Sequence, residues 1–348
     1  MPQTLYRERR AASIENDHLR VTVLEGGGHI AEIFDKDAAV NPLWTPAWTS
    51  IEPYLYDRAT HHEYGAGAEA PLLAGIMGHN LCLDFFGGPS AEEAAAGLPV
   101  HGETSIARFD IRERDGRLTM GTVLPQAQLR FERSLDLQGR AVRIHEAIDN
   151  LSGSDRAIGW TEHVTLGAPF LQTGATQFRA SATRSKVFEG TVGGADYLEQ
   201  GAEFDWPVAP RADGGTADLR LFAGNAASSA YTAHLMDATR EPAYFVAFAP
   251  ALRLAFGYVW KTSDFPWLGI WEENHSRTQP PWNGIALTRG MEFGVSPIPE
   301  PRRKMIDRGR LFDVPTYRWV PARSRVEVEY WAITRHADAI PESLDWPA

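Results

Sequence analysis

Short segments in which apolar and polar residues alternate recur along the sequence, and turn residues separate them about every 10 residues. One such segment, 19–24, ends at three glycines and is followed by a second at 29–34, which is the pattern of a β-hairpin. Similar segments lie at 106–109, 118–120, 127–131, 142–148, 157–166, 177–189, 218–223, 243–248, 253–260, 267–272, 285–293 and 325–333. Long helical periodicity is nearly absent, so the sequence predicts an all-β sandwich of large antiparallel sheets with few short helices.

The chain has 348 residues, and 43% of them are hydrophobic, which is enough for a large core. All-β folds often reach this length as one unit. No low-complexity linker or internal repeat interrupts the pattern. We therefore predict one domain over residues 1–348, with 1–13 as a polar leader at its periphery, and a loop with one short helix at 87–98.

Charge and cysteine content exclude several classes of function. The formal net charge is -11, with 34 Lys+Arg against 45 Asp+Glu, whereas nucleic acids and anionic membranes require a basic face. No stretch approaches the roughly 18 consecutive apolar residues of a membrane helix, and no apolar segment follows the arginines near the N-terminus. A single cysteine, Cys82, permits neither an internal disulfide nor a cysteine-based zinc site. We expect a cytoplasmic protein without a nucleic-acid or membrane partner.

Other common chemistries lack their motifs. His61 and His62 are adjacent, so on a strand they would face opposite sides rather than share a metal. The three glycines at 26–28 are not followed by the Lys-Ser/Thr pair of a phosphate loop, and no Gly-x-Ser-x-Gly is present. We expect no metal site.

Two histidines and a late glutamate are the main candidates for chemistry. His101 precedes a glycine that lets a ligand approach the backbone, and His163 precedes an irregular strand end at 167–170. Glu292 alternates with Met291 and Phe293, so it faces the opposite way from both, and partial burial would raise its pKa. A histidine that faces a carboxylate can move protons on a sugar hydroxyl. Each residue could instead be structural, and Glu272 and Glu273 are alternative bases.

The aromatic residues allow two interpretations. The chain holds 11 Trp, 10 Tyr and 16 Phe. Aromatic faces stack on sugar rings, but large β-sandwiches also use aromatic residues to fill their cores.

Around His101, His163 and Glu292 the sequence resembles the aldose 1-epimerase (galactose mutarotase) superfamily. Five regions carry the resemblance in the family's order: 15–21 with 27–30; His101-Gly102; His163 with the following 167–170; 203–207; and Glu292 with the prolines at 297 and 299. Two departures are visible: the stretch 78–84 lacks the family's arginine, and Glu162 precedes His163 where the family usually has asparagine. The chain is therefore more similar to divergent members.

The resemblance implies a β-supersandwich and a reaction on a small-molecule sugar. The low basic content near the motifs favours a neutral aldose over a sugar phosphate, although Arg58, Arg277 and Arg289 leave room for an anionic one. Glu292 would take the proton of the anomeric hydroxyl, His163 would protonate the ring oxygen, and His101 would orient the ring. No cofactor is implied, and the oligomeric state is left open. Substrate contacts would come from His79, Asn80, Glu103, Trp160, Glu162, Trp271 and Glu272.

Two other functions stay open from the sequence. One is a carbohydrate-binding protein without catalysis on the same scaffold. The other is a sugar lyase or hydrolase that uses Glu162 and a second carboxylate, such as Glu292, about 5–9 Å apart.

Overall fold

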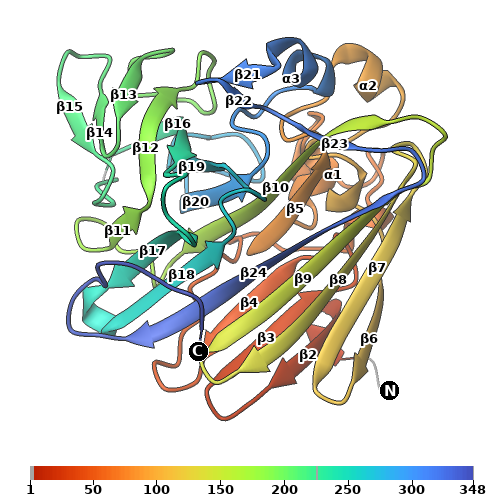
Figure 1. Cartoon of the computed structure of the whole chain (residues 1–348), viewed down its shortest axis with the longest axis horizontal. Coiled ribbons are helices and arrows are strands. Elements are labelled where there is room, and N and C mark those ends of the chain that lie inside the picture. The colour runs from red at the N-terminus through yellow and green to blue at the C-terminus, as the bar shows by residue number, and fades with distance from the viewer. Residues whose placement is uncertain (1–3, 225, 348) are drawn as a thin grey trace.

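The computed structural model describes residues 4–224 and 226–347, and two large antiparallel sheets form its framework (Figure 1). The 12-stranded sheet has the order β1 (Thr4–Tyr6), β2 (Arg9–Glu15), β3 (Leu19–Leu24), β4 (Ile30–Asp35), β5 (His79–Asp84), β10 (Arg156–Gly167), β20 (Leu287–Gly294), β19 (Trp267–Asn274), β16 (Ser228–Met236), β12 (Ala182–Val187) and β13 (Glu203–Asp205), and β23 (Arg318–Val320) pairs with β10. The eight-stranded sheet has the order β11 (Gln177–Ala180), β17 (Ala243–Ala249), β18 (Leu254–Trp260), β24 (Arg325–His336), β9 (Ala141–Asn150), β8 (Leu129–Gln138), β7 (Arg117–Leu124) and β6 (Asp110–Arg114).

Smaller elements decorate the sheets. Two small sheets pair β14 (Val208–Pro210) with β15 (Thr216–Asp218), and β21 (Arg310–Leu311) with β22 (Val314–Pro315). The three α-helices in the described part of the chain are short: α1 (Ala70–Leu73), α2 (Ala91–Ala95) and α3 (Arg302–Arg308). Helix α2 confirms the short helix predicted within 87–98. None of these helices is long and apolar enough to cross a membrane.

The two large sheets pack face to face around one extensive apolar core, and β7, β8, β9 and β24 run in front of β3 and β4 in Figure 1. Side chains from both sheets fill this core: Phe131 and Tyr330 come from the eight-stranded sheet, and Trp160 and Phe293 come from the other. Each of these four side chains is fully buried. The predicted all-β sandwich is therefore confirmed.

The N-terminal segment differs from the expected peripheral leader. Strand β2 pairs with β3 over Ala11–Glu15, so the segment is part of the sheet. Arg9 is only 1% exposed, because its guanidinium donates to the carbonyl oxygens of Gly26 and Gly75 and approaches the Glu52 carboxylate. A buried guanidinium with several acceptors anchors the segment. Residues 1–3 of the expected leader lie outside the described part of the chain.

Two segments that the sequence predicted as single strands differ in the structure. The segment 177–189 divides at Ser181, where the chain leaves the eight-stranded sheet as β11 and enters the 12-stranded sheet as β12. The predicted strand at 218–223 was wrong beyond its first residue, since β15 ends at Asp218. Strand β16, which lies between β12 and β19, was not predicted.

Candidate active site

A row of polar side chains crosses the middle of the 12-stranded sheet. His163 on β10 lies directly opposite Asn80 on β5 and opposite Glu292 on β20. Residues directly opposite in an antiparallel pair project from the same face of the sheet. The Nε2 atom of His163 is 3.0 Å from Oε1 of Glu292. The sheet register thus brings together two residues 129 positions apart in the sequence.

His101 reaches the same place from a turn beside β5. Its backbone N–H donates to Gly87 O and its carbonyl accepts from Leu83 N, which fixes the turn on both sides. Gly102 has φ of +76°, and a Cβ there would lie 2.0 Å from Leu83 O, so only glycine fits. The His101 and His163 rings are 5.0 Å apart. The predicted convergence of His101, His163 and Glu292 is what the structure shows.

These three residues line a cavity of about 280 Å³. The volume is near the lower limit for ligand pockets, which suits one small molecule. The Trp271 ring meets His163 edge to face at 5.9 Å and also lines the cavity. The remaining lining comes from Glu69, Leu72, Leu73, Ile76, Phe86, Gly87, Gly88, Val100, Phe188, Thr191, Val192, Tyr231, Arg277, Trp282 and Pro299.

Burial controls the charge of the reactive groups. Glu292 is 2% exposed and His163 is 5% exposed. Burial raises the pKa of Glu292 well above its usual value and lowers the pKa of His163 to about 3. Burial, with His163 nearby, also lowers the pKa of His101. This burial therefore favours a neutral imidazole beside a protonated carboxyl.

The contact between His163 and Glu292 is close but is not an aligned hydrogen bond. Although 3.0 Å separates the two atoms, Oε1 of Glu292 has no partner of hydrogen-bond geometry among the described residues. Nδ1 of His163 lies 3.1 Å from the Thr165 hydroxyl. No lysine or arginine in the described ranges lies within ion-pair distance of Glu292. The carboxyl group is thus free to exchange a proton with a ligand.

Three expected substrate contacts point into the core instead. The Glu162 side chain projects from the opposite face of β10 to that of His163, because the side chains of successive strand residues alternate between the two faces of a sheet. It accepts from His79 at 2.8 Å, Arg133 at 3.0 Å and Trp160 at 3.0 Å, and each of these residues is fully buried. His79, Trp160 and Glu162 are therefore structural, and the carboxylate pair of Glu162 with Glu292 does not form. This overturns the lyase or hydrolase alternative that used that pair.

Three further candidates lie outside the cavity. Glu103 accepts from the backbone N–H groups of Gln126 and Ala127 and so fixes a loop. Glu272 is ion-paired with Arg289 at 2.7 Å, on the opposite face of β19 from Trp271. Asn80 projects beside His163 but is fully buried and does not line the cavity.

Glu273, the other alternative base, is also committed elsewhere. Its carboxylate accepts from the Ser276 backbone N–H at 2.8 Å and from the Ser276 hydroxyl at 2.7 Å. Of the three candidate bases, only Glu292 meets a histidine in the cavity.

Sequence reasoning missed most residues around the rest of the cavity, and it considered Arg277 only as a possible partner for an anionic sugar. Arg277 pairs with Glu69 at 3.2 Å, donates to Val192 O, and lies over the Trp282 ring at 4.8 Å. Glu69 immediately precedes α1, and Trp282 lies in a proline-rich loop. Neither segment alternates as a strand does, so no periodic signal indicated them.

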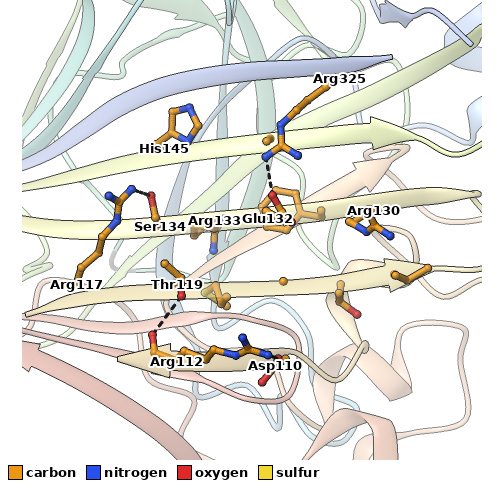
Figure 2. A pocket seen from close by; sticks show the side chains of 16 residues that line it. Asp110, Arg112, Arg117, Thr119, Arg130, Glu132, Arg133, Ser134, His145 and Arg325 are labelled. Atoms are coloured by element: carbon orange, nitrogen blue, oxygen red, sulfur yellow. Dashed lines mark hydrogen bonds and ion pairs between the residues drawn. The ribbon is translucent and has the colours of Figure 1, made fainter. Parts of the chain in front are cut away.

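Two other polar features are poorer candidates. A hollow of about 590 Å³ lies on the outer face of the eight-stranded sheet. Its side chains are drawn in Figure 2, where Arg325 pairs with Glu132 and Arg112 with Asp110. Five arginines line it against two acidic residues, but Arg112, Arg117, Arg133 and Arg325 each pair with a carboxylate, and the hollow is an open sheet surface. Asp35, Asp37 and His336 have metal-like spacing, but the Arg140 guanidinium bonds both aspartates and supplies the cation.

Comparison with known proteins shows similarity in structure but not in sequence. No family model matches the sequence, and no curated protein matches it. A proposed aldose 1-epimerase from Klebsiella pneumoniae superimposes with a TM-score of 0.66 at 12% identity, covering 96% of this chain and 82% of that one. A galactose mutarotase-like protein from Clostridium acetobutylicum gives 0.61 at 11%, covering 96% and 98%. One from Lactobacillus casei gives 0.59 at 12%, covering 93% and 100%. The chain has the galactose mutarotase-like fold.

Proposed function

We propose that this protein is an aldose 1-epimerase that interconverts the anomers of a free monosaccharide by opening and closing the sugar ring. The observation that carries the proposal is the close pair of His163 and Glu292, with His101 beside it, buried in a cavity of about 280 Å³. The likeness to mutarotase-like folds supports a sugar as the ligand. The pair supplies both a proton donor and a proton acceptor, and this reaction needs no other chemical group.

The base removes the proton from O1 while the acid donates a proton to the ring oxygen O5. The C1–O5 bond breaks, and the O1 electrons form the C1=O1 carbonyl. Rotation about C1–C2 presents the other face of the carbonyl, and closure reverses both transfers. Each proton-transfer group typically contributes about 10²–10⁴-fold to the rate.

We assign Glu292 as the base and His163 as the acid in ring opening, with His101 orienting the ring oxygen. Burial favours the shared proton on Glu292 rather than on His163, and in that form Glu292 is the acid and His163 is the base. Both forms hold one acid and one base, and ring closure requires each group to take the other role. The proposal therefore depends on the pair and its one mobile proton.

The test is the effect of Glu292→Gln on anomer exchange, measured by saturation-transfer NMR with a panel of free aldoses. Glutamine keeps the size of the side chain but cannot exchange a proton, so exchange should slow by at least about 10²-fold. Glu103→Gln is the matched control, because its carboxylate only accepts two backbone N–H bonds outside the cavity. Unchanged exchange in Glu292→Gln would refute the assignment.

The same panel separates catalysis from carbohydrate binding alone. Thermal shift measures binding without requiring a reaction. A sugar that stabilises the wild-type protein while its anomers exchange at the uncatalysed rate would favour a non-catalytic sugar-binding protein. Faster exchange that depends on Glu292 would favour the epimerase.

A further inference from the structure

Much of the cavity wall has no hydrogen-bonding side chain. Leu72 and Leu73 of α1, together with Ile76, belong to one buried apolar cluster, and Val100 packs against it. All four residues line the cavity. Leu72, Leu73, Ile76 and Val100 thus form an apolar wall of the cavity.

Several of the cavity's other polar side chains are engaged with the protein. Arg277 and Glu69 pair with each other, and the Tyr231 hydroxyl donates to Pro297 O. The Trp282 indole N–H has no acceptor among the described residues, but its ring lies beside Arg277 and Trp271 and is not part of the apolar wall. Five polar residues expected from the sequence to hold sugar hydroxyls do not line the cavity: His79, Asn80, Glu103, Glu162 and Glu272. A hydroxyl pressed against the apolar wall would lose its water without gaining a partner. That loss weakens binding by roughly 5- to 150-fold.

The proposed chemistry decides which part of the sugar meets the apolar wall. His163 protonates the ring oxygen, and the His101 ring is 5.0 Å from the His163 ring. The C6 group is carried by C5, which is bonded to that ring oxygen. Val100 directly precedes His101 and is only partly buried, so the apolar wall begins beside the residue that faces the ring oxygen.

We propose that the substrates are 6-deoxyaldohexoses, sugars that carry a methyl group where common hexoses carry CH₂OH. The methyl group packs against the apolar wall, while O1 and O5 face Glu292 and His163. This inference rests on the proposed function and narrows it to one class of substrate. It also accounts for the side of the cavity that Leu72, Leu73, Ile76 and Val100 line without a hydrogen-bonding side chain.

Matched pairs of sugars test the inference. Each pair compares a hexose with its own 6-deoxy form: galactose with fucose, mannose with rhamnose, and glucose with 6-deoxyglucose, each in both D and L series. In the pair whose sugars reach the highest kcat/KM for anomer exchange, kcat/KM should be at least about 5-fold higher for the 6-deoxy sugar than for the hexose. Equal or better exchange of the hydroxylated sugar in that pair would overturn the inference.

A variant of the apolar wall gives a second test. Val100→Thr keeps the side-chain shape but adds a hydroxyl that can pair with a C6 hydroxyl. It should narrow the preference for the 6-deoxy sugar at least several-fold through KM, with little change in kcat. Val328→Thr is the control, because it places the same hydroxyl in the core between the sheets, away from the cavity. An unaltered preference in Val100→Thr, or the same shift in Val328→Thr, would count against the apolar wall.

The two proposals fail in different ways. Exchange that depends on Glu292 but is fastest for hydroxylated hexoses overturns the 6-deoxy inference and leaves the epimerase intact. No accelerated exchange for any sugar of either class overturns both.

Discussion

Replacing Glu292 with glutamine should stabilise the folded protein at pH 8, even though it abolishes most of the proposed activity. Glu292 is buried, has no cation beside it, and has one carboxyl oxygen without a hydrogen-bond partner among the described residues. Ionising such a group in the folded protein costs free energy that the unfolded chain does not pay. A neutral amide of the same size removes that cost.

The sign follows from the raised pKa of Glu292 in the folded state. The folded protein then holds this proton more tightly than the unfolded chain does. The stabilising effect of the bound proton is complete below the unfolded pKa of about 4.3, and it is lost as pH rises toward the folded pKa. Over that window the loss is about 1.4 kcal/mol per pH unit. The difference between wild type and Glu292→Gln isolates this one group.

Urea unfolding followed by circular dichroism at pH 5 and pH 8 measures the difference. We expect Glu292→Gln to gain stability relative to wild type between pH 5 and pH 8. Glu162→Gln should behave in the opposite way, losing about 3 kcal/mol or more, because it breaks a buried network around Arg133. A Glu292→Gln protein that is less stable than wild type at pH 8, or a difference that does not vary with pH, would refute the reasoning.

Three further substitutions test how the site is held. Gly102→Ala should lower the free energy of unfolding in urea by more than about 1 kcal/mol and should slow anomer exchange. The reason is that alanine is strained at this positive φ and its Cβ would collide with Leu83 O. A variant with wild-type stability would show that the turn adapts. Trp271→Ala should raise KM for exchange about 3- to 10-fold, the value of one aromatic contact, and an unchanged KM would exclude stacking. Thr165→Val removes the hydroxyl that lies 3.1 Å from Nδ1 of His163 and that we expect to fix the tautomer of the imidazole. Anomer exchange should slow about 10-fold, and its pH profile should shift. An identical pH profile would mean that Thr165 does not fix the tautomer.

The fold was predictable where alternation and turns are strong. The glycines after β3 and the alternation in β4 identified the first hairpin correctly. Strand β16 was missed because all but two of its residues are buried, which removes the alternation of apolar and polar residues. The change of sheet at Ser181 was not predictable, because pairing partners are set by residues distant in the sequence.

The site was predictable only in part, for a related reason. Residue type and setting identified His101, His163 and Glu292, and strand register then placed the last two opposite each other. The same reasoning misplaced Glu162 and Glu272. Each is the strand neighbour of a residue that faces the cavity, and a shift of one position reverses the face. Arg277 and Glu69 lie in irregular segments where the sequence has no periodicity to interpret.

The most direct test of the account is whether His163 and Glu292 act as one unit on a sugar anomer. The single variants His163→Gln and Glu292→Gln and their double variant can be compared by saturation-transfer NMR at the anomeric proton. Groups that share one proton transfer show strongly non-additive losses. We expect each single variant to lose about as much rate as the double variant, at least about 10²-fold. Losses that multiply independently, or exchange that survives in the double variant, would contradict the account.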